Sequence, residues 1–98
     1  MMDRFEFMDK AAELTAGDRN LAYGAPWTNH ERIAKFWSNY LGIDITPEQV
    51  AVCMALLKVA RLMEKSGSAA TDTFTDLVAY SAIAGELSLI EEERRHSS

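Results

Sequence analysis

The sequence has little of several residue types and patterns that would point to particular kinds of protein. It contains one cysteine, Cys53, among 98 residues, so no disulfide forms within the chain and a reducing compartment is expected. No uncharged run approaches the roughly 20 apolar residues that a membrane-spanning helix needs. The first ten residues, MMDRFEFMDK, are too charged for a secretory signal peptide. We therefore expect a soluble cytoplasmic protein without a membrane partner.

An excess of positive charge is also lacking. The net charge of −5 argues against a nucleic acid polymer as partner, because such proteins present a basic face to phosphates. A small anionic ligand held by a few local cations stays possible. Internal repeats, low-complexity segments and strand-like alternation are absent as well. The length predicts a single domain over residues 1–98.

Apolar residues recur at three- and four-residue spacing, which predicts an all-α protein. The expected helices span about 3–16, 28–41, 47–65 and 72–94, and an irregular loop covers 17–27. Thr28 and Glu31 form a predicted capping box, as do Thr46 and Gln49. The short turns favour an antiparallel four-helix bundle. Its apolar excess and the small residues of the last helix, Gly85 among them, predict self-association into a dimer or a higher homo-oligomer.

The helix at 47–65 organises this prediction, since almost every side chain from Val50 to Met63 is apolar. A helix that is apolar on all sides is expected to be packed on all sides, with Cys53 buried inside the bundle. The Phe36, Trp37 and Tyr40 stripe of the preceding helix is expected in the core. His30 is expected to be exposed, and no other histidine or cysteine stands at zinc-ligand spacing from it.

Two pairs of charged residues are candidates for a site. Asp72 and Asp76, four apart, face the same way near a helix start, where they either hold Mg²⁺ or serve as an N-cap and an ion-pair partner. Lys58 and Arg61 share a face of the central helix and should approach these carboxylates across the 66–70 connection. They form either an ion-pair network between helices or a clamp for phosphate.

The loop at 17–27 is the third candidate. Arg19 offers a phosphate contact, and Tyr23 and Trp27 offer flat rings on which a base can stack. Asn29, two residues after the loop, is a further candidate ligand-binding residue. The alternative is an ordinary surface loop whose aromatic rings are tucked against the helices.

Three motifs resemble a family of small, uncharacterised phage and prophage proteins. The first spans residues 18–42 and combines DRN-x2-YG-x-P, N-x2-RIA-x2-W and YLG. The second is LKVARL at 57–62, and the third is D-x3-DL-x2-Y at 72–80. That family is distantly similar to the all-α, MazG-like nucleoside triphosphate pyrophosphohydrolases. The resemblance implies a MazG-like bundle that binds Mg²⁺ through carboxylates on two antiparallel helices and works as a dimer or tetramer.

The chain departs from that pattern at the first metal helix. MazG-like enzymes carry Glu-x-x-Glu there, whereas this chain presents Lys58-x-x-Arg61. Two cations repel Mg²⁺ and attract phosphate. The departure counts against hydrolysis more than against nucleotide binding.

Three functions therefore compete. We favour a non-catalytic binder of a nucleotide or related phosphorylated ligand, which in a phage sequesters a nucleotide signal of host defence. The second is a Mg²⁺-dependent pyrophosphohydrolase, and Mg²⁺ is a cofactor only in that case. The third is a structural or partner-binding helical protein in which the four charges lock the helices together.

Overall fold

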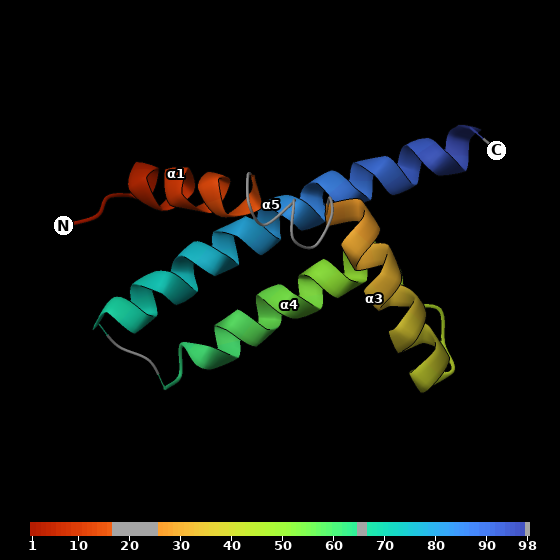
Figure 1. The fold of residues 1–98 in the computed structure, drawn as a ribbon, viewed down its shortest axis with the longest axis horizontal. Helices are drawn as coiled ribbons and strands as arrows, with labels where there is room; N and C mark the ends of the chain where they lie inside the picture. Colours follow the sequence, from red (N-terminus) through yellow and green to blue (C-terminus); the bar gives the residue numbers. More distant parts are fainter. Residues whose placement is uncertain (17–25, 65–66, 98) are drawn as a thin grey trace.

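All regular secondary structure in the described part of the chain is helical. This computed structural model describes residues 1–16, 26–64 and 67–97. Within these ranges there are four helices and no strand, so the all-α prediction is confirmed. The helices are α1 (Arg4–Thr15), α3 (Pro26–Leu41), α4 (Pro47–Arg61) and α5 (Gly67–Ser97) (Figure 1).

A capping side chain defines the start of α4. Thr46 Oγ1 accepts from the Gln49 amide at 3.2 Å while Gln49 Oε1 accepts from the Thr46 amide at 3.0 Å. This reciprocal pair is the predicted capping box at the start of α4. The capping box predicted at Thr28 is wrong, because α3 already begins at Pro26 and Thr28 lies within its first turn. Proline suits this position, since a first-turn amide has no intrahelical partner.

The last helix also begins earlier than the sequence suggested. The sequence predicts a connection at 66–70, but α5 starts at Gly67. Asp72 is therefore not the N-cap and lies in the second turn. Residues 67–70 include two alanines, which favour a helix. The glycine and serine beside them are more typical of a connection, so the sequence pattern did not indicate this earlier start.

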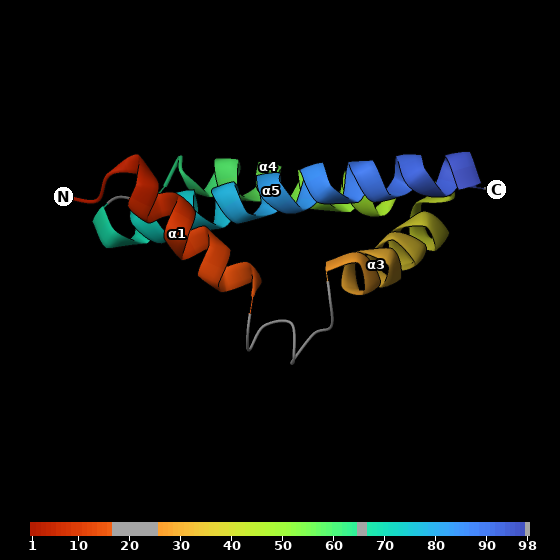
Figure 2. The same cartoon turned by 90° about the horizontal axis from the view of Figure 1, so that it is seen from above.

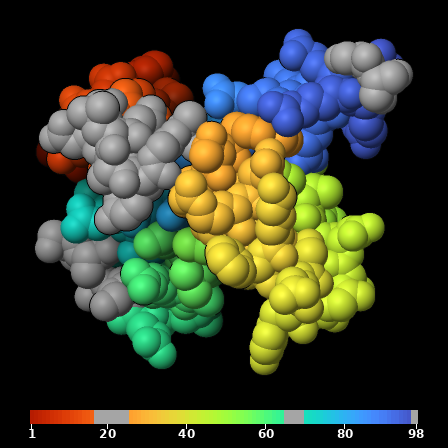
Figure 3. Space-filling view, turned by 45° about the vertical axis from the view of Figure 1, so that its right-hand side comes forward, coloured from red at the N-terminus to blue at the C-terminus, as the bar shows by residue number. Residues whose placement is uncertain are grey.

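The helices form two layers. α4 and α5 lie side by side as an antiparallel pair, with α1 packed on α5 and α3 mainly on α4 (Figures 1 and 2). Figure 2 shows α1 and α3 on the same side of the α4–α5 pair, both inclined to it. In the space-filling view α3, in orange and yellow, lies between atoms of α4 and the blue C-terminal half of α5 (Figure 3). The fully buried side chains Val50 and Leu87 come from α4 and α5.

This arrangement leaves much more apolar surface open than the sequence suggested. The expectation that α4 is packed on all sides is wrong: Leu56 is 60% exposed, and Cys53 is exposed too. The predicted core stripe on α3 is wrong at Phe36 and Tyr40, which are 69% and 88% exposed. No neighbour lies close to Gly85 either, since nothing is found within 4 Å of a Cβ built there. With only two layers of helices, part of the surface of each helix stays exposed.

His30, expected to be exposed, is instead one of the few buried polar residues. Its side chain is 4% exposed, and its ring makes an edge contact with Tyr80 of α5. Nδ1 donates to the carbonyl oxygen of Pro26 at 2.8 Å, so the hydrogen of the neutral ring sits on Nδ1. Nε2 is buried without a hydrogen-bond partner among the described residues. Desolvation by burial lowers the pKa of His30, and the bond to Pro26 partly opposes this.

The lowered pKa of His30 predicts a loss of stability in mild acid. The unfolded chain takes up a proton near the ordinary pKa of about 6.5, while the folded chain resists it, so the unfolded state holds more protons below that pH. The free energy of unfolding should therefore fall as pH drops through about 6.5 toward the lowered pKa, by at most about 1.4 kcal/mol per pH unit. Urea unfolding between about pH 7.5 and 5.5 measures this.

Substitution of the buried ring provides the comparison. His30→Phe should flatten the pH dependence, because it removes the group whose pKa burial lowers. An equal slope in the wild type and His30→Phe would show that His30 does not contribute.

Candidate functional site

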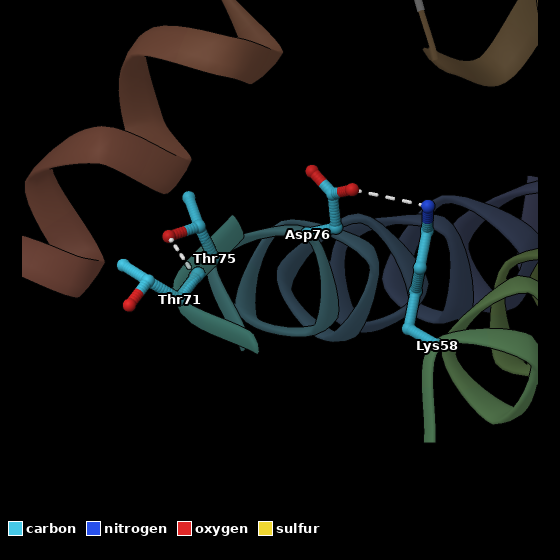
Figure 4. A network of polar contacts seen from close by, with 4 residues as sticks. All are labelled: Lys58, Thr71, Thr75 and Asp76. Atoms are coloured by element: carbon cyan, nitrogen blue, oxygen red, sulfur yellow. Dashed lines mark hydrogen bonds and ion pairs between the residues drawn. The ribbon is translucent and has the colours of Figure 1, made fainter. Parts of the chain in front are cut away.

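An ion pair between Lys58 and Asp76 joins the two long helices near the closed end of their hairpin. The Lys58 Nζ lies 3.0 Å from the Asp76 Oδ2, and the side chains are 13% and 27% exposed. Figure 4 shows Lys58 reaching from α4 toward Asp76 on α5. Beside it, the Thr75 hydroxyl donates to the carbonyl oxygen of Thr71 at 3.0 Å. Because the pair is largely shielded from water, it should couple the helices more strongly than a surface pair does.

A second carboxylate of α5 holds the opposite end of α4. The Glu91 Oε1 accepts from the backbone amide of Glu48 at 3.0 Å, in the first turn of α4, where amides lack intrahelical partners. A negative charge is favourable at that end of the helix dipole, and a cation such as Lys58 is favourable at the other. α5 thus contacts α4 with a carboxylate at each end, about 22 Å apart along α5.

The rest of the predicted charge cluster does not assemble. Arg61, the last residue of α4, is exposed, and so is Asp72. Within the described residues neither makes an ion pair. Two of the four predicted charges, Lys58 and Asp76, meet, and the pair neutralises the cation that was expected to attract phosphate.

The predicted aromatic platform lies elsewhere. Trp27, in the first turn of α3, packs under the guanidinium of Arg94, whose carbon is 4.1 Å from the ring centroid. Arg94 follows Asp76 by about 27 Å along α5, so Trp27 and the Lys58–Asp76 pair occupy opposite parts of the hairpin. Asn29 is partly exposed on α3. Arg19 and Tyr23 lie outside the described residues.

Sequence reasoning did not find the Arg94–Trp27 contact. The run at 91–95 is strongly charged, a pattern typical of a solvated helix end. An arginine stacks on an aromatic face while its charge stays in water, so the charge pattern alone gave no signal of this contact.

No metal cluster accompanies the ion pair in the described part of the chain. Among the residues with described positions, no three metal-ligating side chains of the His, Cys, Asp or Glu type gather together. An open hollow of about 210 Å³ lies between the end of α1, the start of α3 and α5, lined by Thr15, Pro26, Ala82, Ile83 and Glu86. None of the predicted site residues lines this hollow.

The feature that stands out is the side of α4 turned away from α5. We call it the outward face; it comprises Val52, Cys53, Leu56, Leu57, Val59 and Ala60 of α4, with Met63 in the turn that follows. All seven residues are exposed, from 44% at Val52 and Val59 to 85% at Met63 among the larger side chains. A contiguous exposed apolar surface of this kind is typical of an interaction site.

A double-mutant cycle tests the Lys58–Asp76 pair. Lys58→Met leaves a largely buried carboxylate without its partner and should lower the free energy of unfolding by about 1–3 kcal/mol. Lys58→Met with Asp76→Leu should recover most of this, because apolar groups replace a buried pair at little cost. The same cycle on Glu31 and Lys35, a 3.4 Å surface pair, should give a coupling of about 0.3–0.5 kcal/mol. Equal couplings in urea unfolding would contradict a shielded pair.

Comparisons with known proteins place the chain among phage proteins. The profile of a domain of unknown function, DUF6378, matches residues 6–88. The Gene 55 protein of Mycobacterium phage L5 is 44% identical over 85 residues, which are 86% of this chain and 53% of that protein. The Gene 55 protein of Mycobacterium phage D29 is 38% identical over 86 residues, 88% of this chain and 54% of that protein.

The match covers only part of these relatives. The chain spans about half the length of the curated relatives it matches. No solved structure matches it. None of the helices in the described part of the chain is long and apolar enough to span a membrane. The predicted resemblance to small phage proteins of unknown role is confirmed, and the chain belongs to the DUF6378 family.

Proposed function

We propose that this chain is a non-catalytic interaction protein that binds another helix on the outward face of α4. The observation that carries the proposal is the exposure of that face over about three turns, with Leu56 60% exposed at its middle. Helices buried against a partner carry apolar residues at every third or fourth position. α4 carries such a pattern on a side that the helices of the described residues leave exposed.

The distribution of charge along α4 supports the same function. Lys58 is turned toward α5 and paired with Asp76, and on helical geometry Arg61 lies on the flank opposite Val59, away from the centre of the outward face. The outward face therefore carries no charged side chain between Gln49 and Glu64. Exposed helix surfaces are usually covered with charged residues, so an uncharged apolar face is better explained by a partner than by solvent.

The composition of the face fits a site in the host cytoplasm. Cys53 is a free, exposed cysteine within it, and free thiols persist in reducing compartments.

Photo-crosslinking in cells that produce the chain tests the proposal. A photoreactive amino acid replacing Leu56 should give a covalent adduct with one defined protein, whether a second copy or another chain. The same amino acid at Leu89, which is 65% exposed on α5, is the matched control and should give no such adduct. Equal adduct yields at the two positions, or none at position 56, would contradict an interaction through the outward face.

A phosphorylated ligand is the second candidate, and Arg61 is the observation that favours it. Its guanidinium is exposed and makes no ion pair within the described residues, and it lies one turn beyond Lys58. Arginine binds phosphate through two parallel hydrogen bonds. Arg19 and Tyr23 would complete a nucleotide site, and sequestration of a nucleotide signal of host defence would be its use. Against this, a helix C-terminus is the negative end of the helix dipole and disfavours anions.

A thermal-shift screen over nucleotides and cyclic nucleotides tests this candidate. A ligand present at a hundred times its dissociation constant should stabilise the fold by about 2.7 kcal/mol. Arg61→Gln should remove the shift, whereas Arg32→Gln, an exposed arginine on α3, should keep it. No shift with any nucleotide would remove the ligand from consideration.

The hydrolytic alternative gains no support from the geometry. It would need Mg²⁺ held by Asp72 and Asp76 together, and Asp76 already faces the ammonium of Lys58 at 3.0 Å. A cation beside the carboxylate competes with a metal ion for the same charge.

A further inference from the structure

We infer that protonation of His30 releases the first turns of α3 from α5 while the α4–α5 hairpin stays folded. The start of α3 is then a flap that opens in mild acid. The surface involved is distinct from the outward face of α4, so the inference stands independently of the proposed function. Two features carry it: the way in which each end of α3 is held, and the surroundings of the His30 ring.

The start of α3 is held to α5 by two ring contacts. His30 makes an edge contact with Tyr80, with ring centroids 6.4 Å apart, and Trp27 lies under the guanidinium of Arg94. Tyr80 and Arg94 are about 21 Å apart along α5, and the fully buried Leu87 lies midway between them. α3 also lies between α4 and the C-terminal half of α5 in Figure 3. The start of α3 therefore bridges the part of α5 that holds Leu87.

The other end of α3 is anchored independently of these rings. The backbone amide of Ile45 donates to Ser38 Oγ at 2.8 Å, and the amide of Gly42 donates to the carbonyl oxygen of Ser38 at 2.9 Å. Gly42 has a φ of 71°, a left-handed conformation that glycine adopts without strain. These contacts tie α3 to the turn before α4. Loss of the ring contacts therefore frees the start of the helix and leaves its end attached.

The surroundings of the His30 ring suit only its neutral form. A protonated imidazole has two N–H donors and needs a partner for each. Nδ1 donates to the carbonyl oxygen of Pro26 at 2.8 Å, whereas Nε2 is buried with no hydrogen-bond partner among the described residues. A proton on Nε2 thus creates a buried, unpaired and charged donor, which is costly until the ring reaches water. Movement of the start of α3 away from α5 brings it there.

The charged residues of the surrounding helices are engaged elsewhere or exposed. They are the pairs Lys58–Asp76 and Lys35–Glu31, Arg94 on Trp27, Glu91 on the backbone amide of Glu48, and the exposed Glu13, Arg32 and Glu86. The pKa of His30 is lowered by desolvation, which the bond to Pro26 opposes, and neither cause is a charged side chain. Release into water is therefore the route that the described residues leave for accommodating the proton.

The sign of the effect follows from proton linkage. In the open form the ring lies in water, where its pKa is close to the ordinary value of about 6.5. The closed form binds the proton less readily, so acid favours the open form. Below about pH 6.5 each pH unit raises the opening equilibrium constant by up to about tenfold, until the lowered pKa of the closed form is reached. Opening exposes Leu87 and the ring of Tyr80.

Hydrogen exchange of the full chain between about pH 7.5 and 5.5 tests the flap, with protection factors corrected for the intrinsic pH dependence of exchange. The amides of residues 30–34 should be less protected than the inner amides of α4 and α5 at every pH, because they exchange through local opening. Below about pH 6.5 their protection should fall by up to about tenfold per pH unit. In urea below the unfolding transition it should change little, since local opening exposes little surface.

Two single substitutions separate the proton from the contact. His30→Phe keeps an aromatic ring beside Tyr80 and should remove the pH dependence of protection in α3. Arg94→Gln weakens the other contact and should lower that protection by the same factor at every pH, because arginine does not titrate in this range. In the wild type, NMR of the His30 ring should show that the fall in protection levels off where the folded chain itself takes up the proton.

Three results would overturn the inference. Protection of residues 30–34 equal to that of α4 and α5, in value and in urea dependence, would mean that α3 is released only when the whole chain unfolds. Protection that does not fall in mild acid, or a fall that persists in His30→Phe, would mean that His30 does not control the opening. If His30→Phe does not fold, the wild-type comparison between exchange and ring titration decides the outcome by itself.

Discussion

The contact between α4 and α5 is the interaction on which the rest of the structure depends. These helices contribute the fully buried Val50 and Leu87, and α5 places a carboxylate at each end of α4. Asp76 pairs with Lys58 at the closed end of the hairpin, and Glu91 accepts from the first-turn amide of Glu48 at the other. Both polar contacts agree in sign with the helix dipole of α4. α1 and α3 then add a second layer on one side of this hairpin (Figure 2).

Because α5 binds one side of α4, the two sides of that helix have different roles. The inner side holds Val50 and Ala51 without exposure and directs Lys58 to its partner. The outward face holds apolar residues that stay exposed beside the described helices. Single exposed apolar residues are ordinary on protein surfaces, but here they form a continuous, uncharged row on one helix. The account of function follows from this division between the two sides.

The sequence was sufficient for the local structure and for one tertiary contact. Capping by Thr46 and Gln49 depends on neighbours in the chain, and so could be predicted. The approach of Lys58 to Asp76 followed from two antiparallel helices joined by a short connection. Exposure could not be predicted in the same way, because an apolar side chain such as Leu56 looks alike in sequence whether its own chain or a partner covers it. His30 was misjudged for a related reason, since its partner Tyr80 is distant in sequence. The contact of Trp27 with Arg94 was not foreseen because these residues too are distant in sequence.

The central claim is that α4 packs against α5 on one side and is exposed on the other. The reactivity of the Cys53 thiol tests this claim most directly. Cys53 is the sole cysteine of the chain and lies on the outward face, so its reaction with Ellman's reagent reports on that face alone. The account predicts that in dilute solution the thiol of the folded chain reacts nearly as fast as that of the urea-unfolded chain, because Cys53 is exposed. A thiol that reacts much more slowly in the folded chain than in the unfolded chain would contradict the account.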